Sequence, residues 1–218
     1  MHMSRFVLYQ VTVLALSALA VAAPARADII VVTGVNNQGT DNVLLNPATD
    51  VLTVTGTVGA DNDLVNFTSS SGSGLLDADP SGQATVSGGT GNVNFTELTF
   101  GLANTDTFTR AVFNINAATD GSALIHVEGV NINGGFFEDD FTVDANGQNF
   151  FTVTAINGQL ISSISLTGIN GATFEDVRQV RLGGDDITTA VPEPTSMLLF
   201  GTGLAGMAAR MRRRRSAV

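Results

Sequence analysis

The alternation of apolar and polar residues is the main structural signal in the middle of this chain. The clearest case is Leu52–Val58, where Thr53, Thr55 and Thr57 fall on one side and mainly apolar residues on the other. A strand sends successive side chains to opposite faces, whereas a helical stripe has a longer period. About ten such runs occur, and they predict strands: Ile29–Thr33, Val51–Val58, Leu64–Thr68, Ala84–Ser87, Val93–Phe100, Phe108–Ile115, Ala123–Val130, Phe150–Ile156, Leu160–Leu166 and Val177–Leu182.

Turn residues separate these runs and suggest how they connect. Asn157-Gly158 lies between two apolar runs, which is a strong short hairpin signal, and Asp120-Gly121 has the same position between two earlier runs. Gly, Thr and Asn are abundant in this region, and Pro is sparse. The pattern predicts an all-β domain of about ten strands, an antiparallel β-sandwich or jelly roll, with a β-solenoid as the alternative.

The N-terminal segment has the pattern of a secretory signal peptide. Arg5 precedes a mostly apolar run, Phe6–Ala23, and a small-x-small site follows at Ala25-Arg26-Ala27. This order predicts a signal helix over residues 1–27, with cleavage by signal peptidase after Ala27. An uncleaved membrane anchor is the alternative, and the polar, strand-like continuation argues against it.

The C-terminal segment, residues 191–218, combines three ordered features. Pro192, Glu193 and Pro194 come first, an apolar run follows at Met197–Ala209, and an Arg cluster ends the chain. The apolar run is short for a bilayer of about 30 Å, so flanking residues must help it to span. The cluster stays cytoplasmic by the positive-inside rule, which leaves the domain outside. Its members are Arg210, Arg212, Arg213, Arg214 and Arg215.

This tail resembles the PEP-CTERM sorting signal. The resemblance implies that an exosortase, a membrane enzyme, recognises Pro192-Glu193-Pro194 and removes the tail after an inner-membrane intermediate. It also implies a Gram-negative host and an association with exopolysaccharide and biofilm. The segment Gly134–Gly184 is similar to the uncharacterised β domains of such exoproteins. We therefore divide the chain into a signal peptide (1–27), a β domain (28–190) and a sorting signal (191–218).

Charge and composition exclude several classes of function for the β domain. Residues 28–190 hold three Arg and nineteen acidic residues, a formal net charge of −16. A basic patch for nucleic acid is therefore absent, and so is electrostatic docking on anionic lipid. The whole chain contains no Cys and no Lys, which excludes disulfides, thiolate metal sites and lysine Schiff bases.

Catalytic signals are weak in this sequence. His126 and Glu128 are expected on one face of a strand, and no Gly-x-Ser-x-Gly elbow occurs. A surface histidine beside a carboxylate is the preferred interpretation. A carboxylate-based hydrolase remains the enzymatic alternative, because such an enzyme needs two acids at a set separation. The absence of Trp, and of Tyr from the mature domain, argues against a sugar-stacking cleft.

Acidic turns are the remaining candidates for a ligand site. Asp61, Asp63, Asp139 and Asp140 are the best candidates for calcium, although no complete calcium loop is present and turn chemistry explains most such residues. We expect no other cofactor.

The Thr face of Leu52–Val58 raises ice or glycan binding as a further option, although polar-out alternation predicts the same spacing. Taken together, the sequence predicts an exported, non-enzymatic protein. Its expected role is structural or adhesive, at the cell surface or in the extracellular matrix, with exopolysaccharide as its partner.

Overall fold

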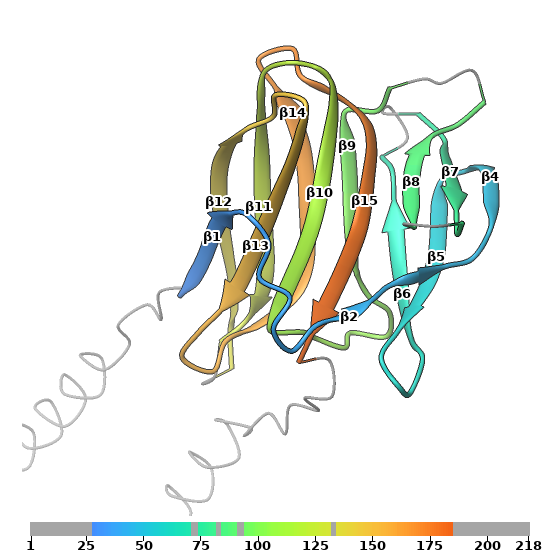
Figure 1. Cartoon of the computed structure of the whole chain (residues 1–218). Helices are drawn as coiled ribbons and strands as arrows, with labels where there is room; N and C mark the ends of the chain where they lie inside the picture. Colours follow the sequence, from blue (N-terminus) through green and yellow to red (C-terminus); the bar gives the residue numbers. More distant parts are fainter. Residues whose placement is uncertain (1–27, 71–73, 82–83, 91–93, 132–133, 185–218) are drawn as a thin grey trace, which may run out of the picture.

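A computed structural model describes residues 28–70, 74–81, 84–90, 94–131 and 134–184. The described residues form fifteen strands and no helix. The strands assemble into two sheets whose pairings are all antiparallel. In Figure 1, β13, β10 and β15 run in front of β11 and β14. The predicted all-β class is confirmed, and the antiparallel pairing excludes the β-solenoid alternative for this part of the chain.

We name the two sheets A and B. Sheet A has the order β1 (Ile29–Thr33), β13 (Gln148–Ala155), β10 (Arg110–Thr119), β15 (Thr173–Gly183), β8 (Thr85–Gly88), β7 (Leu76–Asp79) and β4 (Ala48–Val51), and β2 (Asp41–Asn42) pairs with β15 beside β8. Sheet B has the order β12 (Phe136–Asp144), β11 (Ser122–Val130), β14 (Leu160–Ile169), β9 (Glu97–Leu102), β6 (Asp63–Thr68), β5 (Thr53–Val58) and β3 (Leu44–Leu45).

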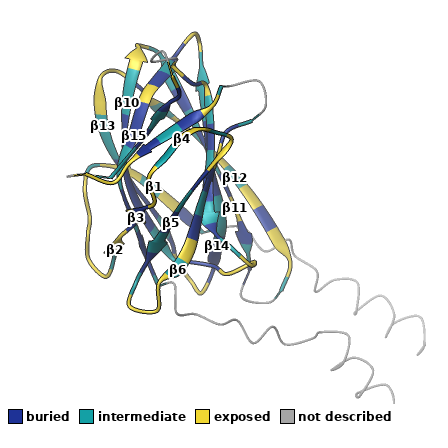
Figure 2. Ribbon diagram, turned by 90° about the vertical axis from the view of Figure 1, so that its right-hand side faces the viewer, coloured by how far each residue is buried: buried dark blue, intermediate teal, exposed yellow. Residues whose placement is uncertain are grey.

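Phenylalanine rings join the two sheets through one hydrophobic core. Phe67 and Phe100 of sheet B have ring centroids 5.6 Å apart, and Phe100 meets Phe113 of sheet A at 5.4 Å. Phe113 then contacts Phe151, with centroids 6.1 Å apart. Each ring is almost fully buried, which contributes about 1.5–3 kcal/mol per side chain. The sheets therefore face each other in a sandwich-like arrangement, with buried residues between them (Figure 2).

Both predicted hairpins are wrong, although the turns exist. Asn157 and Gly158 have the positive φ angles of 56° and 77° that the Asn-Gly signal predicts. They connect β13 of sheet A to β14 of sheet B, and Asp120-Gly121 likewise connects β10 of sheet A to β11 of sheet B. Turn residues determine only the local reversal of the chain. Each of the two connected strands packs its apolar face against the core, but from opposite sides. Strands that follow each other in the chain therefore belong to different sheets.

The ten predicted runs all contain strand residues, but the number of strands is larger than expected. Five strands lie wholly or mainly outside those runs: β2, β3, β4, β7 and β12. The predicted signal helix and C-terminal membrane helix fall in residues 1–27 and 185–218, outside the described residues. Among the residues that are described, no helix is long and apolar enough to cross a membrane.

Candidate functional site

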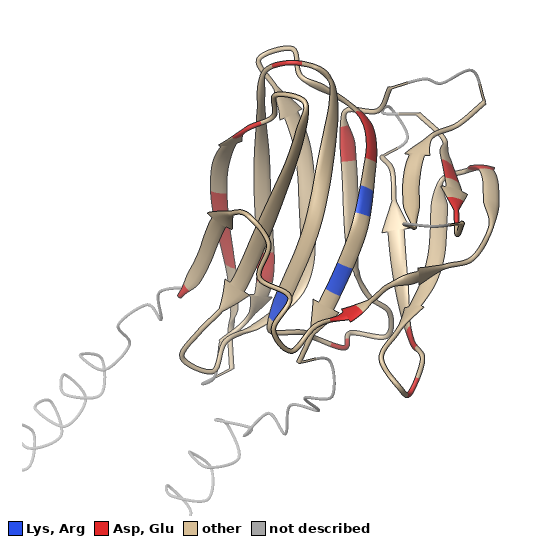
Figure 3. Ribbon diagram, in the orientation of Figure 1, with Lys and Arg blue, Asp and Glu red and all other residues tan. Residues whose placement is uncertain are grey.

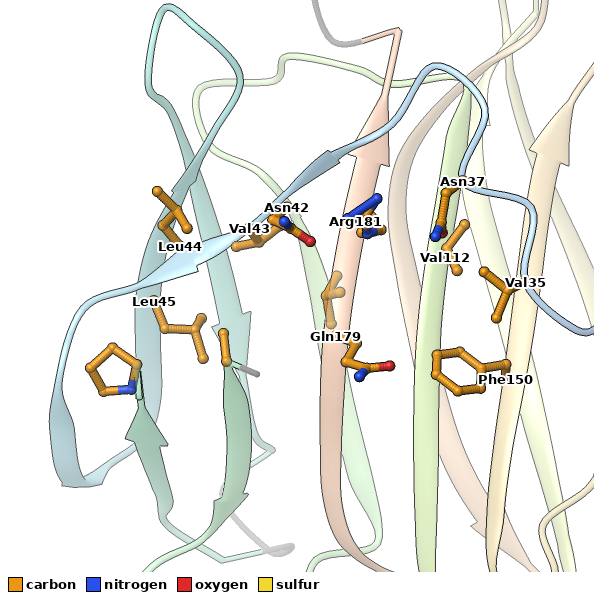
Figure 4. A pocket seen from close by; sticks show the side chains of 13 residues that line it. Val35, Asn37, Asn42, Val43, Leu44, Leu45, Val112, Phe150, Gln179 and Arg181 are labelled. Carbon is orange, nitrogen blue, oxygen red and sulfur yellow. The ribbon is translucent and has the colours of Figure 1, made fainter. Parts of the chain in front are cut away.

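A groove of about 450 Å³ lies on the outer face of sheet A. Val112 forms part of its floor, and because its neighbours Ala111 and Phe113 point into the core, Val112 faces the opposite side. Polar residues come from the surrounding strands and loop, and none of the described lining residues is Asp or Glu. We call this site the sheet A groove (Figure 4); the lining residues that matter chemically are Asn37, Asn42, Phe150, Gln179 and Arg181.

A β-bulge in β15 brings Gln179 to this groove. Val112 pairs with Arg181 and Asn114 pairs with Arg178, so two residues of β15 lie opposite Phe113 alone. Gln179 has a φ of 56°, a left-handed conformation that costs a non-glycine residue about 1–3 kcal/mol. Bulges re-aim side chains in this way and are common beside functional sites. In Figure 4 the Gln179 amide extends toward the ring of Phe150.

The loop between β1 and β2, residues 34–40, forms one wall of the groove. The hydroxyl of Thr152 donates to the carbonyl of Gly34 at 2.9 Å and accepts from the backbone N–H of Asn36 at 3.1 Å. Thr152 is 1% exposed, so the loop covers this hydroxyl. The Gly34 N–H donates to the Phe150 carbonyl at 2.8 Å, and Nη1 of Arg110 donates to the Gln38 carbonyl at 2.5 Å. These bonds fix the wall before any ligand arrives.

Three arginines lie on β10 and β15, and they differ in their partners (Figure 3). Arg110 bonds to the loop wall, and Arg178 forms an ion pair with Asp176, with Nε 2.5 Å from Oδ1. The hydrogen bonds that the Arg178 guanidinium donates to Asp176 raise the pKa of Arg178 above its ordinary value. Within the part of the chain that the structure describes, the Arg181 guanidinium has no hydrogen-bond or ion-pair partner. Among the described residues, the sheet A groove therefore holds one cation without a partner.

The outer face of sheet B carries a row of polar residues across six strands, and the register shift of β11 against β14, between Glu128 and Gly129, lies outside this row. The paired positions are Thr53, Thr68, Thr99, Ser165, His126 and Asp140. The hydroxyls of Thr53 and Thr68 lie 3.2 Å apart, and those of Thr99 and Ser165 lie 2.7 Å apart. Thr53, Thr55 and Thr57 do share the outer face, as predicted, because Val54 and Val58 are buried opposite them. Many of these hydroxyls bond to one another.

His126 forms a small ionic cluster at the end of this row. Its Nδ1 lies 2.6 Å from Oδ1 of Asp140, and its Nε2 lies 3.4 Å from Oε1 of Glu128. The hydroxyl of Ser163 donates to the other oxygen of Glu128 at 2.9 Å. The hydrogen bond to Asp140 is the main cause that raises the pKa of His126 above 6.5. The shared face of His126 and Glu128 is confirmed, and both ring nitrogens face carboxylates rather than a serine.

The four calcium candidates are not brought together by the fold. Asp61 and Asp63 lie at the β5–β6 turn, while Asp139 and Asp140 are consecutive in β12. Consecutive strand residues point to opposite faces, and Asp140 already bonds to His126. No group of three or more His, Asp or Glu side chains in the described residues is arranged to hold a metal. Calcium binding stays a prediction. Ala25 and Ala27, the tripeptide and the Arg cluster lie outside the described residues.

Sequence reasoning missed the sheet A groove. Its residues come from β2, β3, β10, β13, β15, the β1–β2 loop and the segments beside β7 and β8, so no contiguous motif marks it. One local signal was available in the sequence. Two consecutive polar residues, Arg178 and Gln179, interrupt the alternation of β15, which resumes at Val180-Arg181, and such an interruption is typical of a bulge.

Comparison with known proteins identifies the tail. Residues 190–214 match the PEP-CTERM protein-sorting motif, so the chain carries the sorting signal predicted from Pro192-Glu193-Pro194 and the Arg cluster. The class that fold and motif define is an all-β protein with a PEP-CTERM sorting motif, which implies export and sorting by an exosortase. The match covers the tail and not the β domain. No curated protein matches the chain.

Two solved structures are similar to part of the fold. One is a family 29 carbohydrate-binding module from Piromyces equi, with a TM-score of 0.28, 13% identity, and coverage of 72% of this chain and 91% of that one. The other is a family 11 carbohydrate-binding module from Clostridium thermocellum in complex with a β-1,3-1,4-mixed-linked tetrasaccharide, with a TM-score of 0.27, 12% identity, and coverage of 74% and 91%. Likeness at this level carries no argument about the ligand of this chain.

Proposed function

We propose that this chain is a non-enzymatic protein that acts at the cell surface or in the extracellular matrix, with a structural or adhesive role in exopolysaccharide or biofilm. The observation that carries the proposal is the sorting motif at residues 190–214, which follows closely after the last described strand, β15. Signal peptidase removes residues 1–27, and the apolar segment then holds the chain in the inner membrane. The exosortase acts at Pro192-Glu193-Pro194 while the Arg cluster stays in the cytoplasm.

The enzymatic alternative, a carboxylate-based hydrolase, needs two acids that face each other across a cleft. The described lining of the sheet A groove contains no carboxylate. Glu128 and Glu138 are direct cross-strand neighbours, but they lie on the outer face of sheet B, away from this groove. These positions favour a binding or structural role for the domain over hydrolysis.

Glycan or ice binding is the second candidate, and the two faces bear on it differently. The Thr face of sheet B uses several of its hydroxyls in internal pairs, which lowers its capacity to order water or hold a sugar. The sheet A groove offers polar side chains beside one aromatic ring. Among these options, glycan contact through sheet A has the better support.

The sorting route is tested by changing Pro192, Glu193 and Pro194 together to Ala in a host that carries an exosortase. We expect a folded β domain that accumulates in the inner membrane with its tail uncleaved, measured by cell fractionation and mass spectrometry. The matched control changes Thr188 and Thr189 to Ala, just upstream of the matched residues, and should be processed normally. Processing and release of the triple variant at the wild-type level would contradict the proposed route. N-terminal sequencing of the exported chain should begin at Asp28.

A further inference from the structure

The unpaired guanidinium of Arg181 is the first observation that indicates a ligand. The domain is strongly acidic, yet no acid is among the described residues that line the sheet A groove. The other two arginines of this sheet have partners: Arg178 pairs with Asp176, and Arg110 bonds to the Gln38 carbonyl and the Thr154 hydroxyl. An arginine fork matches a carboxylate with two parallel hydrogen bonds. The free charge therefore fits an anionic group that enters from outside.

The side-chain amides around Arg181 indicate that the rest of the ligand carries groups that both donate and accept hydrogen bonds. Asn42 pairs with Arg181 across β2 and β15, Gln179 is aimed outward by the bulge, and Asn37 belongs to the loop wall. No hydrogen bond involving these three side-chain amides is present within the described residues. An amide both donates and accepts, as a sugar hydroxyl does. Inorganic phosphate at neutral pH mainly accepts, so it would leave the amide oxygens unused.

Phe150 supplies an apolar surface beside these polar groups. Its ring faces away from the core, between the loop wall and the floor residue Val112 (Figure 4). The C–H face of a sugar ring packs on such a surface while its hydroxyls reach the amides. The volume, about 450 Å³, lies within the range of about 300–1,000 Å³ that small-molecule sites occupy.

We infer that the sheet A groove binds a carboxylated sugar unit, a uronic acid of an acidic polysaccharide. Arg181 receives the carboxylate, Asn37, Asn42 and Gln179 bond to hydroxyls, and Phe150 packs on the ring. The inference rests on the proposed function, since it names the matrix component that an adhesive exported domain would hold. Thr152 and Arg110 are positioning residues, because they fix the loop wall and do not contact the sugar.

Calorimetric titration of the full-length chain in mild detergent at pH 7.5 tests this site, with trigalacturonate as the probe and neutral galactotriose as the matched ligand. We expect trigalacturonate to bind more tightly than galactotriose, and binding to weaken as salt rises. Arg181→Gln should lower the affinity for trigalacturonate by about tenfold or more, since hydrogen bonds between charged groups are the strong ones. Arg181→Lys keeps the charge but not the fork, and should lose less. The control His126→Gln, on sheet B, should bind like the wild type.

Three results would overturn the inference: no binding of trigalacturonate by the folded wild type, equal affinity for galactotriose, or full affinity in Arg181→Gln. If Arg181→Gln fails to fold, Asn37→Ala, in an exposed loop, replaces it, and unchanged affinity in that variant would count against the site in the same way. Sorting is measured separately by processing of the tail. A correctly sorted protein that fails to bind trigalacturonate refutes the groove and leaves the proposed route standing.

Discussion

The outer faces of sheets A and B are built over the same core but differ in regularity. On sheet B, β11 and β12 pair without a shift from Ser122–Asp144 to Val130–Phe136, and β11 with β14 has a single shift, between Glu128 and Gly129. On sheet A, the pairing of β10 with β15 has three register shifts. The more regular face, on sheet B, places polar side chains opposite one another, where they bond among themselves. The irregular face leaves Gln179 and Arg181 directed at a groove.

This difference suggests where a β domain of this kind gains a binding site. A continuous ladder satisfies its own polar groups, as the paired hydroxyls and the His126 cluster do on sheet B. A bulge breaks the ladder and costs local strain, but it exposes groups that the fold itself does not use. Variants that act on the common core, on one face, or on single surface pairs should therefore have effects of decreasing size.

Truncation of a ring in the shared core should have the largest effect, because it destabilises both sheets together. Phe113→Ala removes a ring that contacts both Phe100 of sheet B and Phe151 of sheet A. Such truncations cost about 3–5 kcal/mol through lost burial and the cavity that remains. Denaturant unfolding of the full-length chain measures the change. The control Phe136→Ala removes a ring that is 90% exposed and should change stability by less than about 0.5 kcal/mol; equal losses in the two variants would contradict the shared core.

Loosening the groove wall should change the dynamics of sheet A and leave sheet B unchanged. Thr152→Val keeps the volume but removes a hydroxyl that bonds to Gly34 and Asn36. We expect a loss of about 0.5–1.5 kcal/mol in unfolding free energy, because two backbone groups of the loop lose a hydrogen-bond partner. Hydrogen exchange should rise in loop 34–40 and stay unchanged in β11 and β12. Thr152→Ser keeps the hydroxyl and should preserve protection of the loop; equal exchange in both variants would show that this bond does not hold the wall.

The His126 cluster should make sheet B sensitive to pH. The pKa of His126 is raised above 6.5 in the folded protein, so the ion pair stabilises the fold fully below that pH. This contribution is lost as the pH rises through the raised pKa. We expect His126→Gln to be less stable than the wild type at pH 5.5 by about 0.2–1 kcal/mol, since Asp140 is well exposed, and this deficit to shrink as the pH rises through the raised pKa. A deficit that grows with pH in thermal unfolding would contradict the assignment.

Single threonine hydroxyls on the outer face of sheet B should contribute least to the stability of the fold. Thr53→Ala removes one side of an exposed pair with Thr68, whose oxygens lie 3.2 Å apart. The expected change in unfolding free energy is within about 0.5 kcal/mol. Thr55→Ala, which removes the partner of the Asn46 amide, gives a second case of the same size. A loss above 2 kcal/mol in either variant would mean that this row carries more of the fold than its exposure suggests.

The sequence was sufficient for the strands that alternate clearly, and β1 has the predicted bounds, Ile29–Thr33. It was insufficient for β12, Phe136–Asp144, because acids occupy most of its outward positions and one inward position, Asp139, and hide the pattern. Charged residues protect such an edge strand from pairing with other chains, which is a role that strand propensity does not capture. The strands β2 and β3 have two residues each, too few for any periodicity.

The His126 cluster and the sheet A groove could likewise be predicted only in part from the sequence. His126 and Glu128 are two residues apart in one strand, so their shared face follows from the sequence. Asp140 joins them only through the register of β11 with β12. The sheet A groove depends on a bulge and on a loop held by Thr152, and both arise from pairings between residues that are far apart in the chain. Long-range register is the information that a single sequence lacks.

The central claim is that the sheet A groove, and not the outer face of sheet B, binds an acidic sugar. The most direct test compares how far a ligand protects each face from chemical labelling. The chain contains no Cys, so single substitutions report without background. Val35→Cys lies in the groove wall at a position that is 52% exposed, and Leu64→Cys lies on sheet B at one that is 41% exposed. Maleimide labelling of the full-length variants is followed by mass spectrometry with and without trigalacturonate. We expect trigalacturonate to slow labelling at Val35→Cys alone; protection at Leu64→Cys, or at neither position, would contradict binding in the sheet A groove.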